Sequence, residues 1–365
     1  MSVVAGFSDA ASRTDMTGFG APGPGRAGIA RRVRRAGLSR SVIVGIVLLV
    51  AIFVVFCISI SVGDYPVPLA DVVPGIFGRG EGRIPYIIQT LRLPRALTAL
   101  LVGAALGFSG AIFQSLARNP LASPDIIGIT QGASVSAVFI IIVIGGSYAF
   151  VSTGALLGGF IAASLIYVLA YRRGMSSYRL VLIGIGVSAM LQAVTSYLMT
   201  RAEIYDAARA TVWLTGSLNN RGWEHVRPVG VVMAALFPAV LYLARGLRVL
   251  QLGDDAAKGL GVPVERTRGA LIAVAVAMAA VATASAGPIN FVAFIAAPIA
   301  RRLVRQPLTL VPSALVGALV LLSSDLVARR IFAPTELPVG VITGIVGAPY
   351  LLWLLARSNK IGKGG

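Results

Sequence analysis

The chain has 365 residues, of which 56% are hydrophobic and 13% charged, and its mean hydropathy is +0.85. This composition excludes a single soluble domain and predicts an all-α, polytopic membrane protein, because backbone polar groups in lipid must be satisfied within each helix. The net charge of +18 would suggest a nucleic-acid partner in a soluble protein, but here the positions of the charges matter more than their sum. We therefore expect a lipid membrane around the chain and no nucleic acid.

Residues 1–40 are rich in arginine, glycine, proline and serine, which is typical of a disordered basic tail. The apolar run that follows is too long for a cleavable signal, so we expect it to remain as an anchor with the tail in the cytoplasm. The motif Gly18–Gly23 reads G-x-G-x-x-G, but no strand precedes it, and a dinucleotide site is not expected there.

Apolar segments of about 20 residues are long enough to cross a bilayer as helices. Ten such segments are predicted, with soft edges: residues 42–62, 94–116, 127–147, 149–171, 179–200, 228–245, 269–287, 288–303, 309–328 and 338–356. Gly287-Pro288 separates the seventh predicted span from the eighth. A break of this kind indicates either a transport pathway or a kink packed by neighbouring helices.

An even number of spans places both termini on the same side. With the N-terminus inside, the cytoplasmic segments hold most of the lysine and arginine residues, as the positive-inside rule requires. The chain then divides into the tail 1–40, a transmembrane domain over 41–357 and a short cytoplasmic tail over 358–365.

The segment 247–268 is a charged, helix-prone loop that this orientation places in the cytoplasm. Leu252, Ala256 and Leu260 repeat at i, i+4 and i+8 and would form an apolar stripe. The acidic Asp254 and Asp255 near its start disfavour the alternative of a helix lying on anionic lipid. The loop is therefore predicted to serve a partner at the membrane surface.

Arg92 and Arg95 lie where the second span enters the membrane from outside, three residues apart and thus on one helical face. Two interpretations stay open. The side chains could snorkel to lipid phosphates, or they could form a docking patch for an acidic partner.

Five ordered motifs carry a family resemblance. They are Leu91–Leu97, Leu101–Pro124, Leu252–Gly261, Gly287–Arg302 and Glu336–Tyr350. Over roughly residues 42–357 the chain resembles the FecCD family, the membrane subunits of ABC importers for iron-siderophores, haem and vitamin B12. Within that family it is most similar to permeases of the ferric-enterobactin type. One departure is the segment Ala296–Arg301, which lacks the histidine that the family often has there, so no role of that histidine is carried over.

The resemblance implies a type II ABC importer permease fold with about ten transmembrane helices, in a bacterial cell membrane. It implies two cytoplasmic ATPase subunits, an extracytoplasmic substrate-binding protein and a second permease, as a heterodimer more readily than a homodimer. The ATPase-coupling residues would be Leu252, Gly253, Asp254, Asp255, Ala256, Leu260 and Gly261. The binding-protein docking residues would be Arg92, Arg95 and Arg329.

Polar residues inside spans usually face a bundle interior or a water-filled path. Ser188, Gln192, Thr195 and Met199 share one face of the fifth span and are pathway candidates, although they could equally hold helices together. Ser176 and Ser177, in the short loop before that span, are candidates for a cytoplasmic gate.

Other classes of function fit less well. An ion-coupled secondary transporter would need a titratable residue in mid-membrane, and Asp325 is better interpreted as an ion-pair partner of Arg329, four residues later. No ATPase, protease or hydrolase motif is present, so we expect neither an enzyme nor a resident metal or cofactor. The cargo predicted is a ferric siderophore, with haem or cobalamin as alternatives.

Overall fold

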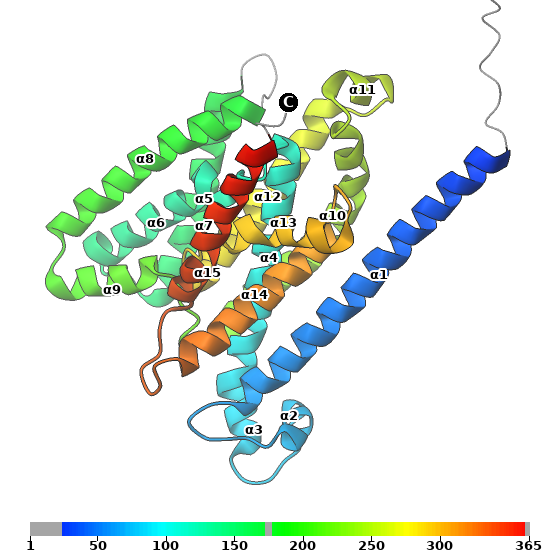
Figure 1. Ribbon diagram of the computed structural model, residues 1–365. Coiled ribbons are helices and arrows are strands. Elements are labelled where there is room, and N and C mark those ends of the chain that lie inside the picture. Colours follow the sequence, from blue (N-terminus) through cyan, green and yellow to red (C-terminus); the bar gives the residue numbers. More distant parts are fainter. Residues whose placement is uncertain (1–23, 172–176, 362–365) are drawn as a thin grey trace, which may run out of the picture.

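The computed structural model describes residues 24–171 and 177–361, and the secondary-structure elements in these ranges are all helical (Figure 1). In chain order they are α1 (Pro24–Ser61), α2 (Leu69–Ile76), α3 (Ile84–Tyr86), the π-helical η1 (Ile87–Arg92), α4 (Leu93–Ala117), α5 (Pro124–Ile127), α6 (Ile129–Phe139), the π-helical η2 (Ile140–Ile144), α7 (Tyr148–Ala170), α8 (Ser177–Arg201), α9 (Ile204–Leu214), α10 (Trp223–Leu250), α11 (Asp254–Gly259), α12 (Val264–Ala286), α13 (Val292–Val304), α14 (Leu310–Arg330) and α15 (Val339–Ile361). The predicted all-α class is confirmed.

Each predicted span falls on a helix, and the helices differ in length. Seven helices within the described ranges are long and apolar enough to cross a membrane, and residues 129–144 and 339–354 form shorter apolar helices. The segment predicted as the eighth span is only the 13-residue helix α13. It is short because Gly287, at φ +78°, ends α12 and the chain remains non-helical as far as Phe291.

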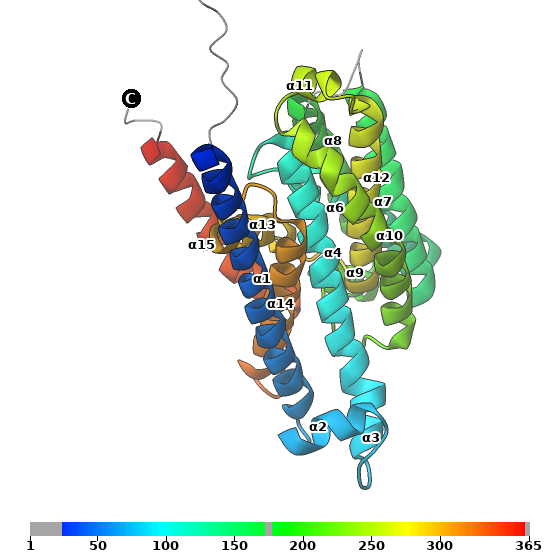
Figure 2. The same ribbon diagram turned by 90° about the vertical axis from the view of Figure 1, so that its right-hand side faces the viewer.

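The helix α4 forms the centre of the bundle, with α1, α14 and α15 on one side and α10 and α12 on the other (Figure 2). Glycines allow its backbone to touch its neighbours. A methyl group at Gly103 would overlap the carbonyl oxygen of Gly317 on α14, and one at Gly110 would overlap that of Ala293 on α13. Close approach of this kind replaces the hydrophobic driving force that lipid does not supply between helices.

Buried side chains surround the break between α12 and α13. Gln114 of α4 donates to the carbonyl of Phe294 at 2.9 Å and accepts from Arg301 of α13 at 2.6 Å. These two hydrogen bonds satisfy a buried amide and fix α13 against the central helix, so the interruption is packed by neighbours on this side.

The two ends of the bundle are different. The start of α1, the end of α15 and α11 lie at one end, while α2 and α3 lie at the other (Figure 1). The described termini thus emerge at the same end, as an even number of crossings requires. Neither α2 nor α9 was among the predicted elements, because both are short helices in segments read as loops.

Candidate functional site

The helix α11 is shorter than the predicted stripe. It covers Asp254–Gly259, while Leu252 lies in the preceding turn and Leu260 is the residue at which the helix ends. Both leucines are nevertheless exposed, at 69% and 65%, and Ala256 is exposed between them. The loop therefore presents apolar surface at the end of the bundle, where a soluble partner could cover it.

The conformation of this loop depends on its glycines and on one buried alanine. Gly253 at φ +119° and Gly261 at φ +77° flank α11, and both values are in the left-handed region that favours glycine. Ala257 is fully buried and anchors the inner face of α11. Asp255 and Lys258 face outward.

An ion pair connects α11 to a buried span. Nη2 of Arg268, near the start of α12, donates to both carboxylate oxygens of Asp254, at 2.8 and 3.0 Å. The Arg268 side chain is 9% exposed, so this pair is shielded from solvent on the arginine side. A displacement of α11 would consequently be transmitted to α12. Sequence reasoning did not identify Arg268, because nothing in its local pattern indicates a partner 14 residues earlier.

At the opposite end, Asp325 is the centre of a charged network. Its carboxylate lies 2.9 Å from Nη2 of Arg95 and 3.2 Å from Nε of Arg329. The predicted pairing of Asp325 with Arg329 is present. Asp325 is fully buried, so the two arginines compensate a carboxylate that would otherwise be costly to desolvate.

The outer side of Arg95 has further partners. Its Nη1 donates to Glu336 at 2.9 Å and to Asn219 at 2.7 Å. The Glu336 side chain is 35% exposed, whereas that of Asp325 is 1% exposed, so Glu336 is the solvent-facing carboxylate of the network. The sequence did not predict Asn219 and Glu336 as partners of Arg95, because the two residues come from separate loops.

Arg92 and Arg329 both bind the end of α1. Arg92 donates to the carbonyls of Ile60 at 2.7 Å and Tyr65 at 2.5 Å, and Arg329 donates to Ser59. Cations at a helix C-terminus satisfy carbonyls that have no partner within the helix. All three arginines predicted to dock a partner thus have structural contacts within the chain.

The pathway candidates on α8 separate into two groups. Ser188 donates to the carbonyl of Gly184 at 2.7 Å, and Thr195 is buried and donates to Leu191 at 3.1 Å. Met199 packs beside a buried cluster of the same subunit. Gln192 is the exposed one.

A second polar row on α8 follows from Gln192. Ser196 and Thr200 continue it at i+4 and i+8, and both are exposed. This row was not predicted, since the sequence alone did not show which side of α8 the bundle covers. Ser176 lies outside the described residues, and Ser177 begins α8 without a described side chain.

Within the described ranges, no group of three or more histidine, cysteine, aspartate and glutamate side chains is placed to hold a metal ion. The site consists of surfaces at the two ends of a helical bundle and of one exposed polar helix face.

Comparison with known proteins agrees with this architecture. The model of the FecCD transport family matches residues 47–357. The ferric enterobactin transport system permease protein FepG of Escherichia coli K12 is 41% identical over 88% of this chain and 98% of its own length. The iron(3+)-hydroxamate import system permease protein FhuG of Bacillus subtilis 168 is 38% identical over 88% of this chain and 98% of its own length.

Solved structures give the same result. A metal-chelate type ABC transporter in an inward-facing conformation superposes with a TM-score of 0.76 at 30% identity, covering 86% of this chain and 98% of that chain. The fold and the matches define a multi-pass translocation subunit of an ABC importer. The chain belongs to the FecCD transport family.

Proposed function

We propose that this chain is the permease subunit of an ATP-driven importer of ferric siderophores in a bacterial cell membrane. It would pair with a second permease, most simply a related chain in a heterodimer, and bind two cytoplasmic ATPases and an extracytoplasmic binding protein. The support for the cargo is that the relatives described above are permeases for ferric enterobactin and for iron(3+)-hydroxamate. A siderophore chelates iron itself, so the subunit that carries it needs no metal-ligand cluster of its own.

The observation that carries the proposal is the geometry of α11. An apolar surface made by Leu252, Ala256 and Leu260 is exposed on a loop that an ion pair holds to a buried span. Exposed apolar side chains on and beside a short surface helix suit insertion into a groove on an ATPase, because apolar residues are the usual anchors of that mode of recognition. The Asp254–Arg268 pair gives a route by which nucleotide-driven movement could reach the transmembrane helices.

At the outer end, Arg95 is the best candidate to dock the binding protein. The guanidinium is held by Asp325 beneath it, and its outer nitrogen bonds the exposed Glu336. A carboxylate of an incoming partner could replace Glu336 without breaking the buried pair. Arg92 and Arg329 would contribute mainly by fixing the end of α1.

The polar row Gln192, Ser196 and Thr200 is the proposed pathway surface of this subunit, facing the second permease across the path. An exposed polar row inside a membrane would otherwise contact lipid at a cost. Haem and cobalamin are the alternative cargoes, since the same arrangement could pass them.

A secondary transporter is disfavoured because Asp325, the acidic residue within α14, already binds two arginines. Asp125 is the counter-candidate. Asp125 lies in α5, and its side-chain Oδ1 is buried without a hydrogen-bond partner. Burial raises the pKa of this carboxyl to about 7, although a hydrogen bond with the backbone of Phe291 opposes the rise. A requirement for ATP rather than a proton gradient separates the two classes.

The test is deletion of the chromosomal copy, followed by uptake of ferric siderophore, haem and cobalamin with iron or cobalt label. The proposal predicts loss of siderophore uptake alone, restored by the wild-type chain and insensitive to an uncoupler while ATP is maintained. Unchanged siderophore uptake, with loss of haem or cobalamin uptake instead, would assign the cargo to the alternative class.

A further inference from the structure

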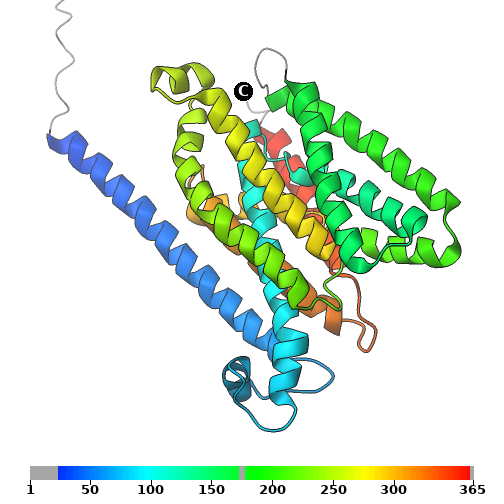
Figure 3. The ribbon, with the colours of Figure 1, turned by 180° about the vertical axis from the view of Figure 1, so that it is seen from behind.

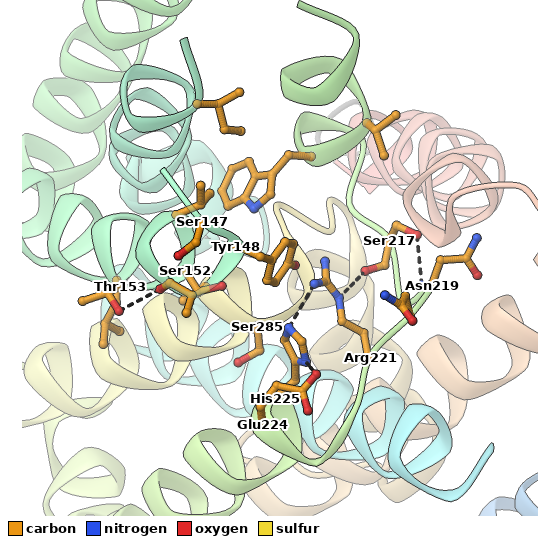
Figure 4. Close-up of a pocket in the computed structure, with 18 of the residues that line it drawn as sticks. Ser147, Tyr148, Ser152, Thr153, Ser217, Asn219, Arg221, Glu224, His225 and Ser285 are labelled. Atoms are coloured by element: carbon orange, nitrogen blue, oxygen red, sulfur yellow. Dashed lines mark hydrogen bonds and ion pairs between the residues drawn. The ribbon is translucent and has the colours of Figure 1, made fainter. Parts of the chain in front are cut away.

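A cavity of about 1000 Å³ lies beside α9, toward the end of the bundle opposite α11 (Figure 1), and Figure 4 shows residues that line it. It is bounded by the start of α7, by α9, by the start of α10 and by the end of α12. Seen from behind, α12 runs between α10 and α7 (Figure 3). Asn219 lines the cavity and also accepts a hydrogen bond from Arg95, so the cavity adjoins the charged network around Asp325.

Arg221 is the cation of this cavity. Its Nε donates to the Ser217 carbonyl at 3.1 Å, its Nη1 lies 3.1 Å from Nε2 of His225, and its guanidinium carbon is 4.5 Å from the centre of the Tyr148 ring. A guanidinium can only donate hydrogen bonds, so Nε2 of His225 is the acceptor from Arg221. The imidazole proton is therefore on Nδ1 of His225, which lies 3.1 Å from the Glu224 carboxylate. In Figure 4, the guanidinium of Arg221 lies beside both Tyr148 and His225, whose ring centres are 5.2 Å apart.

The charge of Arg221 is not neutralised. Among the described residues no carboxylate lies within ion-pair distance of Arg221, and the residue is 8% exposed. Burial lowers its pKa to about 10, with Glu224 opposing the shift, so the side chain remains protonated at neutral pH. Glu224 is 70% exposed at the mouth, where solvent screens it.

Two further donors in the cavity wall have no partner. Nε1 of Trp213 and Oγ of Ser152 are buried and make no hydrogen bond. Buried polar groups are normally satisfied, and an unmade hydrogen bond of this kind costs free energy. A cation and two free donors in one cavity indicate a ligand with anionic oxygen atoms.

The remaining wall is apolar. It includes Leu156 of α7 and Val281 and Ala284 of α12, and the neighbouring outer faces of α7 and α10 expose Leu157 and Val231. A hydrophilic anion would leave this surface uncovered, whereas an amphiphile would fill it with its chains. Aromatic and basic side chains at this level are also typical of the membrane interface.

We propose that this cavity binds an acidic phospholipid, with a phosphodiester oxygen at Arg221, Trp213 and Ser152 and the acyl chains along α7 and α12. Arginine and neutral donors suit a phosphodiester because its oxygens accept several charge-assisted hydrogen bonds at once. The proposed lipid site requires that the chain lies in a membrane. It does not require a particular cargo or ATP.

The probe is phosphatidylglycerol carrying brominated acyl chains, added to the full chain in detergent micelles. In the background Trp223→Phe, Trp353→Phe, Trp213 is the remaining tryptophan and reports bromine contact by quenching. Brominated phosphatidylglycerol is expected to quench Trp213 at a concentration about tenfold lower than brominated phosphatidylcholine, which matches one charge-assisted hydrogen bond.

Three variants in the same background test the assignment. Arg221→Gln is expected to remove the preference for the acidic lipid, and Ser152→Ala to weaken it without removing it. Arg227→Gln, an exposed arginine six residues later on α10 and outside the cavity, is expected to leave the preference intact. If Arg221→Gln fails to fold, two other variants still test the proposed lipid site. One is Ser152→Ala, and the other is Arg221→Lys, which keeps the charge and is expected to retain a reduced preference for the acidic lipid.

Equal quenching by the two lipids in the unaltered cavity would overturn the proposal. So would equal losses in Arg221→Gln and Arg227→Gln, because the preference would then reflect general surface charge. Glycerol 3-phosphate distinguishes a free phosphate from a lipid: its displacement of the brominated lipid at equal concentration would overturn the lipid assignment, and its failure to do so supports it.

Discussion

At the scale of single residues, the network around Asp325 combines buried ion pairs with one exposed carboxylate. Asp325 holds Arg95 and Arg329 in fixed positions, and only Glu336 reaches outward. The exposed carboxylate therefore competes with any acidic partner for the outer nitrogen of Arg95. Removing it should favour docking instead of weakening it.

We predict that Glu336→Gln raises the affinity for the acidic binding protein by severalfold, because Arg95 is freed while its buried pair with Asp325 remains. Binding of the loaded partner to the chain in nanodiscs, measured across a range of salt, checks this. Arg330→Gln is the matched control, since Arg330 is an exposed arginine nearby with no described ion pair. Weaker binding in Glu336→Gln would show that the partner uses Glu336 itself.

The buried network itself should be essential for the fold. Replacing Asp325 by alanine removes the ion-pair partner of Arg329 and leaves Arg95 with Glu336 alone, and breaking a buried pair in this way typically costs about 3–5 kcal/mol. We expect Asp325→Ala to lower the thermal unfolding midpoint strongly, and the double variant with Arg95→Met to recover part of the loss. Strictly additive effects of the two substitutions would contradict the coupling.

Asp125 predicts a pH dependence. Burial raises the folded-state pKa of the Asp125 carboxyl to about 7 from its ordinary value of 3.8, so the folded protein binds the proton more tightly than the unfolded chain does. This contribution to stability is complete below the unfolded pKa and is lost as the pH rises through about 7. Asp125→Asn removes the titration, so the variant should match the wild type near pH 4 and exceed it by a few degrees near pH 8. Parallel midpoint curves for the two proteins would contradict the assignment.

At the scale of elements, the coupling loop is a short helix clamped to a long one. Arg268→Ala should leave the chain inserted and bound to its ATPase through Leu252, Ala256 and Leu260. Uptake should nevertheless fall by about tenfold, because α11 could then move without α12. Arg266→Ala, an exposed arginine two residues earlier, is the control and should transport normally. Loss of ATPase binding in Arg268→Ala would point to a role in assembly instead.

The elements also show what a sequence can and cannot predict. Apolar length and charge asymmetry were sufficient to locate α1, α4, α7, α8, α10, α12 and α14, because each is a continuous run with polar ends. The pairing of Asp325 with Arg329 was predictable because i, i+4 neighbours share a helix face.

The contacts of Arg95 with Asp325 and of Arg268 with Asp254 were not predictable, because they depend on how helices pack. The same limit applies to α8. Its polar residues were visible, but whether Thr195 or Ser196 faces the bundle is decided by the rotation of the helix. The cavity at Arg221 was not predicted either, because its wall combines residues of α7, α9, α10 and α12, and the burial of Arg221 and His225 depends on how these helices pack.

At the scale of the whole molecule, the described chain is asymmetric along the membrane normal. One end presents α11 with the exposed Leu252 and Leu260 that flank it, and the other presents the charged network, the cavity and α9. A subunit that receives cargo at one end and energy at the other would have this arrangement. We propose that the energy of ATP hydrolysis enters this subunit through α11.

The most direct test is ATP-driven uptake of a ferric siderophore into proteoliposomes containing the chain, its partner permease, the ATPase and the binding protein. We predict uptake that requires ATP, is abolished by Leu260→Asp and is largely retained by Lys258→Asp, which places the same charge on the opposite face of α11. Uptake by Leu260→Asp at the wild-type rate, or uptake that persists without ATP, would contradict it.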